Sequence, residues 1–106
     1  MAAATGVEVL DARERERYEI YVDGALAGFS EYKSRPGVIA FVHTEIEPAF
    51  RGRGLGDVLI AHALEESRKQ ELDVLPFCPF VLGYIERHRE YAELVPAAYR
   101  ERFGLG

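Results

Sequence analysis

A glycine-rich segment that separates two apolar segments of different periodicity most constrains this chain. It has the sequence Arg51-Gly52-Arg53-Gly54-Leu55-Gly56, after an extended apolar segment and before one with helical spacing. Glycine adopts positive φ without strain and lets a ligand approach the backbone closely. The free N–H groups and the dipole of a helix N-terminus attract anions at the same place. The segment therefore predicts a strand, a phosphate-binding loop and a helix, with Arg51 and Arg53 adding positive charge.

Other interpretations of this loop are open. A tight turn with solvated arginines has the same composition. Arg-Gly repeats occur in disordered tails that bind nucleic acid, but here there is one copy, and the net charge of -5 argues against a duplex-binding surface. A Walker loop needs Gly-Lys-Ser/Thr after it and a dinucleotide fingerprint needs G-x-G-x-x-G, whereas the spacing here is R-x-x-G-x-G. We therefore expect no nucleic-acid partner.

The length and the cysteine content limit the class of protein. A chain of 106 residues is expected to form a single domain over residues 1–106. One cysteine, Cys78, excludes an internal disulfide and a cysteine-rich zinc site, and no metal is expected. Met1-Ala2-Ala3-Ala4 lacks the charged start of a secretory signal, and no run approaches the ~20 apolar residues of a membrane span. The expectation is a cytoplasmic protein that does not bind membranes.

Alternation and turn signals predict antiparallel strands before the loop. Tyr18–Val22 alternates apolar with polar residues, as a half-buried strand does. Asp23-Gly24 is a two-residue hairpin signal that turns the chain into a second strand over Ala25–Lys33. Pro36-Gly37 ends that strand. Three antiparallel strands are therefore expected, the third of them after this turn.

The third strand and the glycine-rich loop belong to a β-α-β unit. The strand is predicted over Val38–Ile46, and its continuously apolar part, Val38–Val42, is expected to be buried on both faces. Helical spacing predicts an amphipathic helix over Gly54–Glu71. The short apolar run Asp73–Leu75 then predicts a strand parallel to the third one.

The rest of the chain is helical in its spacing. One helix is expected over Phe80–His88, and a further helical region over Tyr91–Phe103 is expected to break near Pro96. The pattern as a whole predicts an α/β (α+β) fold with a mixed, mainly antiparallel twisted sheet, a β-α-β unit and C-terminal helices.

In this order the elements resemble the acetyl-CoA-dependent N-acetyltransferases of the Gcn5-related superfamily. Those proteins combine an antiparallel hairpin region, a splayed central strand, an R/Q-x-x-G-x-G/A loop that opens a helix, and a parallel strand beyond it. The chain is most similar to a small single-domain branch without the usual N-terminal helices. The resemblance covers roughly residues 18–94. It rests on four blocks: His43-Thr44-Glu45-Ile46-Glu47-Pro48, Arg51–Gly54, Pro76-Phe77-Cys78-Pro79-Phe80-Val81, and Tyr84 with His88.

The resemblance implies a cosubstrate and its site. The loop amides of Arg51–Gly56 would hold the pyrophosphate of acetyl-CoA. The backbone of the preceding strand would pair with the pantetheine arm, which places Glu45, Ile46 and Glu47 beside the thioester. Splaying of this strand from Asp73–Leu75 would form a V-shaped slot, and the acceptor amine would enter from the other side.

Acetyl transfer to an amine needs a neutral nitrogen, an oxyanion donor and a proton source for the departing thiolate. His43 is the candidate base, because imidazole titrates near neutral pH; a hydrogen-bonded histidine at a strand end is the alternative. Cys78 has three interpretations: a buried small hydrophobe, a thiol that protonates the leaving CoA, and a nucleophile that accepts the acetyl group. We expect the two side chains to converge at the carboxyl end of the sheet, where pairing would favour the thiolate.

Further candidates are weaker. Tyr84 is a second candidate acid, since many members of the superfamily use a tyrosine on the helix after this strand, but the asparagine often found near the start of that helix is absent. Glu45 and Glu47 are expected either to attract a cationic acceptor or to form a solvated strand end. The sequence thus predicts an acetyl-CoA-dependent N-acetyltransferase with an unidentified amine acceptor. The alternatives are a CoA-binding module without turnover and an interaction domain with a degenerate loop.

Overall fold

Five strands form one sheet in the order β1-β2-β3-β4-β5 in the computed structural model, which describes residues 6–106. The first four strands each pair with the next one along the chain in antiparallel orientation, and β5 pairs with β4 in parallel orientation. The strands are β1 Val7–Ala12, β2 Arg17–Val22, β3 Ala25–Arg35, β4 Val38–Ile46 and β5 Asp73–Pro76. The predicted fold class is therefore confirmed: a mixed, mainly antiparallel sheet that contains a β-α-β unit.

One strand, β1, adds to the three antiparallel strands that were expected. Its residues Val7 and Val9 pair with Val22 and Ile20 of β2 and pack against the core. The apolar alternation here is short and leads directly into a charged run, so it is a weak signal by itself. The expectation about a secretory signal concerns residues 1–4, which lie outside the described residues.

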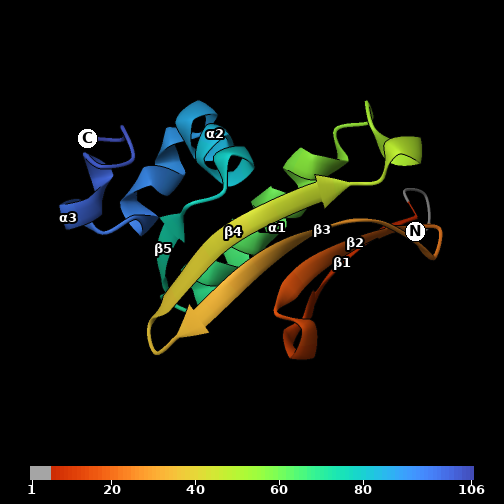
Figure 1. The fold of residues 1–106 in the computed structure, drawn as a ribbon, viewed down its shortest axis with the longest axis horizontal. Coiled ribbons are helices and arrows are strands. Elements are labelled where there is room, and N and C mark those ends of the chain that lie inside the picture. The colour runs from red at the N-terminus through yellow and green to blue at the C-terminus, as the bar shows by residue number, and fades with distance from the viewer. Residues whose placement is uncertain (1–5) are drawn as a thin grey trace.

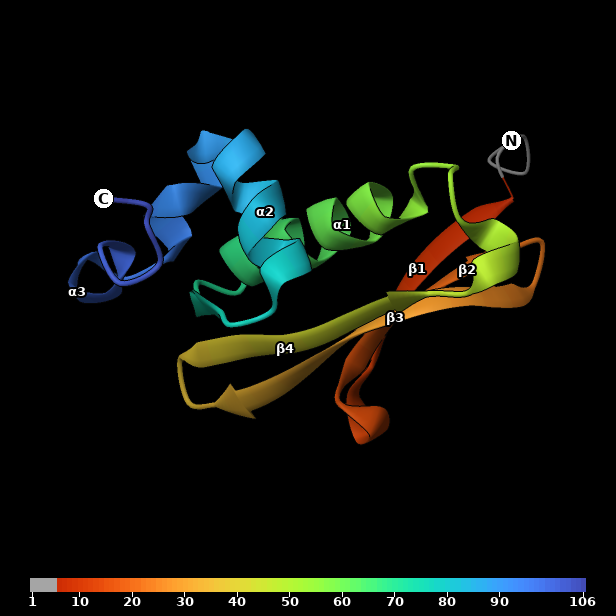
Figure 2. The same ribbon diagram turned by 45° about the horizontal axis from the view of Figure 1, so that its top comes forward.

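The helices gather on one side of the sheet (Figures 1 and 2). These helices are α1 Leu55–Lys69, α2 Pro79–Arg87 and α3 Ala97–Arg100. The 3₁₀ turns are η2 Arg13–Arg15, which connects β1 and β2 away from these helices, η3 Pro48–Phe50 and η4 Arg89–Leu94. The helices predicted over Gly54–Glu71 and Phe80–His88 are confirmed to within two residues at each end. In the third predicted region the break near Pro96 separates η4 from α3, and α3 ends three residues before Phe103. Within residues 6–106, no helix has both the length and the apolar character needed to cross a membrane.

Helix α1 covers the core face of the sheet because its apolar residues recur on one side. Leu59, Ile60, Ala63 and Leu64 are fully buried and belong to the same cluster as Phe41 of β4. Burying each large aliphatic side chain contributes about 1.5–3 kcal/mol, so this face fixes α1 on the sheet. The loop before α1 is thereby held at the end of β4.

The expectation that Val38–Val42 is buried on both faces is wrong. Ile39 and Phe41 are 3% and 0% exposed, but Val42 is 39% exposed. A continuous apolar run suits a strand covered on both faces, whereas here α1 and α2 cover only one face and leave the other open (Figure 2).

A β-bulge in β4 changes which residues face the helices. Phe41 pairs with Tyr32 and His43 pairs with Glu31, so Val42 is an extra residue without a cross-strand partner. Side chains alternate along a strand, and the extra residue reverses their phase. Thr44 therefore faces the helices, as Phe41 does, while His43 turns to the open face.

The open face carries a buried carboxylate. Glu19 of β2 has a side chain only 1% exposed, and it accepts hydrogen bonds of 2.7 Å each from Arg17 Nε and Tyr21 Oη. Arg15 Nε lies 3.2 Å from the same carboxylate, and the Arg17 guanidinium lies over the Phe29 ring. Burial acts to raise the pKa of Glu19, but the hydrogen bonds and the two arginine charges together hold it below its ordinary value.

The depressed pKa of Glu19 predicts an acid-sensitive contribution to stability. This contribution is complete above the ordinary carboxyl value of 4.5 and is lost as the pH falls through the lower folded value. We expect Glu19→Gln to cost about 1–3 kcal/mol of unfolding free energy at pH 7, and the difference from wild type to shrink towards pH 3. Denaturant titrations at several pH values measure it, with exposed Glu86→Gln on α2 as the control. A difference that stays constant from pH 7 to pH 3 would contradict the assignment.

Candidate functional site

The candidate site begins where β4 and β5 diverge. The two strands pair only from Val38 with Asp73 to Phe41 with Pro76. The last link between them is a hydrogen bond of 2.9 Å from the Cys78 amide to the Phe41 carbonyl. Beyond it the chain turns into α2, and in the part of the chain that the structure describes no strand pairs with this edge of β4. The expected V-shaped opening is therefore present.

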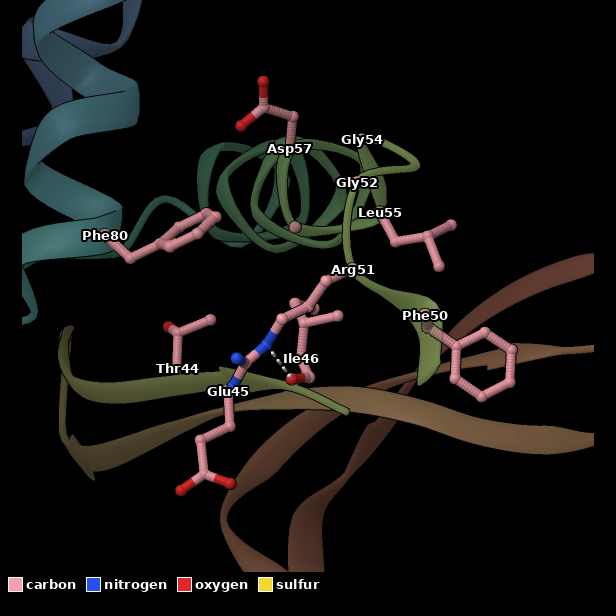
Figure 3. A pocket seen from close by; sticks show the side chains of 11 residues that line it. Thr44, Glu45, Ile46, Phe50, Arg51, Gly52, Gly54, Leu55, Asp57 and Phe80 are labelled. Atoms are coloured by element: carbon pink, nitrogen blue, oxygen red, sulfur yellow. Dashed lines mark hydrogen bonds between the residues drawn. The ribbon is translucent and has the colours of Figure 1, made fainter. Parts of the chain in front are cut away.

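A cavity of about 420 Å³ lies at this opening, between β4, the glycine-rich loop and the first turns of α1 and α2 (Figure 3). Strand, loop and helix all contribute backbone as well as side chains to its wall. Its lining residues are Thr44, Glu45, Ile46, Phe50, Arg51, Gly52, Gly54, Leu55, Gly56, Asp57 and Phe80.

The glycine-rich loop leaves the N-terminus of α1 open. Gly52 and Gly54 have φ of 82° and 74°, and a Cβ at either position would meet nothing within 4 Å. Both glycines are thus required by the backbone conformation rather than by lack of space. Within residues 6–106 no side chain caps α1, and Val58 is the residue whose amide bonds back to Gly54. The preceding amides of the first turn are available to an anion.

Gly56 has a different role from the other two glycines. It is buried in α1, and a Cβ there would lie 2.3 Å from Cζ of Phe80. The missing side chain lets Phe80 of α2 approach α1 and form one wall of the cavity (Figure 3). Arg87 of α2 also bonds the Asp57 carboxylate in the first turn of α1, at 3.2 and 3.3 Å.

The two loop arginines differ in position. The Arg51 side chain runs from the loop to β4, where its Nε donates to the Ile46 carbonyl at 3.1 Å (Figure 3). It therefore brings positive charge into the cavity. Arg53 lies outside the lining, with its guanidinium 5.3 Å from the centre of the Phe50 ring.

The three residues predicted at and just after the end of β4 differ in their position relative to the cavity. Ile46 lines the cavity and packs against the core, whereas the Glu45 side chain points away from it (Figure 3) and only its main chain borders the cavity. Glu47 is not part of the lining, and its amide donates to Ala27 of β3 at 2.8 Å.

The structure does not bring His43 and Cys78 together, so their expected convergence is wrong. Cys78 is 3% exposed, and its Sγ donates to Thr44 Oγ1 at 3.3 Å on the helix side of the sheet. His43 Nε2 instead lies 2.9 Å from Glu45 Oε2 on the open face, and its ring adjoins Phe29. The bulge at Val42 is the physical reason, because it turns His43 away from the side that Cys78 occupies.

Tyr84, the second candidate acid, lies in α2 outside the cavity lining. Its ring stacks on His88 with 4.0 Å between the ring centres. Burial, helped by nearby carboxylates such as Asp57, raises the pKa of its phenol. The hydroxyl therefore stays protonated at neutral pH.

Four lining residues were not among the predicted site residues: Thr44, Phe50, Asp57 and Phe80. Thr44 had a signal, because it lies between His43 and Glu45 in the first motif block. Phe80 likewise lies in the third motif block, whereas Phe50 and Asp57 had no such signal. Asp57 and Phe80 meet at the cavity because α1 and α2 pack side by side, and Phe50 comes from η3 before the loop.

Comparisons with known proteins agree with this architecture. The family model described as GCN5-related N-acetyl-transferase matches residues 17–94. A solution structure of a GCN5-like protein from Staphylococcus aureus is similar with a TM-score of 0.65 and 19% identity, over 86% of this chain and 89% of that chain. At this identity the likeness shows the fold. No curated protein sequence matches the chain.

A second structure is less similar. The ribosomal-protein-alanine N-acetyltransferase from Brucella melitensis biovar Abortus 2308 aligns with a TM-score of 0.49 and 20% identity. The alignment covers 76% of this chain and 64% of that chain.

Proposed function

The chain belongs to the GCN5-related N-acetyltransferase family, and from this membership we propose that it binds acetyl-CoA beside β4 and transfers the acetyl group to an amine. The observation that carries the proposal is the free edge of β4 next to the open N-terminus of α1. The free strand edge can pair with an extended chain of amides, and the open helix N-terminus can bind a diphosphate. Acetyl-CoA contains both.

The diphosphate of the cosubstrate is proposed to bind the first-turn amides of α1. The loop from Arg51 to Gly56 supplies these amides, and Arg51 adds a positive charge. Asp57 would oppose an anion at this place, but Arg87 pairs with its carboxylate and balances the charge. Arg53, outside the lining, is proposed to act only as a distant charge.

The pantetheine arm is proposed to pair with β4 as an added strand would. From the loop, the arm would pass the main chain of Ile46 and Glu45 and reach Thr44, the lining residue to which Cys78 donates a hydrogen bond. The Glu47 amide is already bonded to β3, so its share in the binding is limited. The thioester is thereby proposed to lie at Thr44.

The reaction follows from this placement. The amine nitrogen attacks the thioester carbon, the C–S bond breaks, the CoA sulfur gains a proton and the nitrogen loses one. We propose Cys78 as the source of the first proton, since its thiol donates towards the cavity through Thr44. His43 would accept the second proton only from an amine that reaches the open face of the sheet, where its imidazole and Glu45 form a pair.

One observation favours the alternative of a CoA-binding module without turnover. Neither His43 nor Cys78 lines the cavity directly. In that case acetyl-CoA would bind as proposed but no amine would be acetylated. The third possibility, an interaction domain with a degenerate loop, would bind no CoA at all.

Acetyl-CoA should raise the melting temperature of the protein. A ligand that binds only the folded state stabilises it by about 2.7 kcal/mol at a hundredfold excess over Kd. Thermal melts with and without millimolar acetyl-CoA measure the shift. An unchanged melting temperature, with no CoA retained after desalting, would leave the interaction domain as the better interpretation.

Gly54→Val should abolish acetyl-CoA binding, whereas Gly37→Val should not. Gly37, in the turn between β3 and β4, has φ of 76° and also has open space around its missing Cβ, so both substitutions cause the same kind of strain, about 1–2 kcal/mol. Only Gly54 borders the cavity. Calorimetric titration of both variants compares them. Equal affinity in the two would place the phosphate site elsewhere.

Cys78→Ala should slow amine acetylation about 10²-fold without a change in the KM for acetyl-CoA, because the lost contact is made mainly in the transition state. The burial of Cys78 behind Thr44 favours proton donation, so acetyl-CoA alone should leave no acetyl group on the protein. Steady-state kinetics and mass spectrometry of the intact protein measure the two effects. An adduct on Cys78 that disappears when amine is added would instead identify a nucleophile.

His43→Ala separates the two proposed proton transfers. If the amine enters over the open face, this variant should lose activity most strongly where a neutral imidazole can accept the proton, and it should lose less in acid, because a protonated imidazole is no base. If the amine enters on the helix side, the pH profile should match that of wild type. Unchanged activity in both His43→Ala and Cys78→Ala would remove both residues from the reaction.

A further inference from the structure

Three polar side chains from three elements form a hydrogen-bonded chain behind the cavity. Ser30 Oγ of β3 lies 2.9 Å from Thr44 Oγ1 of β4, and Cys78 Sγ, just before α2, donates to the same Thr44 oxygen at 3.3 Å. Ser30 is fully buried and Cys78 is 3% exposed. Thr44 is the only one of the three that lines the cavity. Of these three hydrogen-bonded side chains, Thr44 alone can therefore contact a ligand in the cavity.

The hydrogen-bonding capacity of Thr44 determines how these three side chains can pass a proton to the cavity. A hydroxyl oxygen has two lone pairs and one hydrogen. When Cys78 and Ser30 both donate to Thr44 Oγ1, its two lone pairs are occupied and its own hydrogen is free to point into the cavity. Donation from both sides also polarises the Thr44 O–H bond and makes it a better donor.

Cys78 lies at the start of a helix. It is the N-cap residue of α2, a helix of nine residues that begins with Pro79. The first-turn amides and the dipole of a helix stabilise negative charge at its N-terminus. A thiolate at Cys78 would also accept a hydrogen bond from Thr44 once the hydroxyl has reversed its direction.

We propose that Thr44 is a catalytic residue that relays a proton from Cys78 to the leaving sulfur of CoA, with Ser30 holding the hydroxyl in place. As the C–S bond breaks, its electron pair on sulfur takes the Thr44 hydrogen, and Thr44 Oγ1 takes the hydrogen of Cys78. The acetylated amine releases its extra proton to water, and water later returns one to Cys78. This relay rests on the proposed function.

The relay explains two observations that a direct role of Cys78 leaves aside. Cys78 does not line the cavity, yet its thiol is directed at a residue that does. A buried serine is placed on the other side of that residue, on the neighbouring strand where Ser30 and Thr44 are register partners. A packing role for Thr44 alone would not require either hydroxyl, since valine has the same shape.

The test compares the kinetics of three substitutions. Thr44→Val keeps the shape without the hydroxyl and should lower kcat about 10²-fold, with an unchanged KM for acetyl-CoA. Thr44→Ser keeps the hydroxyl and should restore most of the activity. Ser30→Ala should have an intermediate effect. Thermal melts confirm that each variant folds.

The double variant Thr44→Val with Cys78→Ala gives the sharpest result. Two residues of one relay act as a unit, so the double variant should be no slower than the slower single variant. The solvent isotope effect on kcat should fall in Thr44→Val, because fewer protons move in the transition state. Effects that multiply in the double variant, or a Thr44→Val enzyme as fast as wild type, would overturn the relay.

The outcomes also separate the relay from the proposed function. Wild-type protein that acetylates an amine, with Thr44→Val equally active, would overturn only the relay. Wild-type protein that binds acetyl-CoA without acetylating any amine would overturn the transfer reaction and the catalytic role of Thr44 together. Wild-type protein that does not bind acetyl-CoA would overturn the site itself.

Discussion

The end of the pairing between β4 and β5 is the constraint on which the rest of the site depends. Four register pairs hold the strands together, and the last lies at Phe41 and Pro76. Proline has no N–H to extend a ladder, and Pro79 then starts α2, so the chain leaves the sheet here. Because β5 stops early, the rest of β4 keeps an edge whose backbone groups can pair with a ligand. The cavity follows from this edge and from α1, which the core holds above it.

The bulge at Val42 decides which chemistry faces the cavity. Without it, His43 would continue the phase of Ile39 and Phe41 and would point towards α2 and Cys78. With it, Thr44 takes that position, and His43 joins Glu45 on the open face. Bulges beside functional sites commonly redirect a side chain in this way. As a result, the Thr44 hydroxyl lies at the cavity wall and the His43 imidazole lies on the open face of the sheet.

Helix α2 completes the site through packing and charge. Phe80 closes over Gly56, which has no side chain to obstruct it, and Arg87 neutralises Asp57 beside the open amides of α1. The ion pair is exposed, so its direct effect on stability is small. Its importance lies in the local field, since an unpaired carboxylate in the first turn would repel the diphosphate that we propose the loop binds.

The sequence by itself determined the order of elements, the parallel β-α-β unit and the glycine-rich loop, because periodicity and turn residues act over short distances. It did not predict β1, since two valines before a charged run make a short pattern. What only the tertiary structure decided is which side chains share a space: Cys78 with Thr44 rather than with His43, and Phe80 against Gly56. These contacts depend on one extra residue in a strand and on helix packing, and neither leaves a local signal in the sequence.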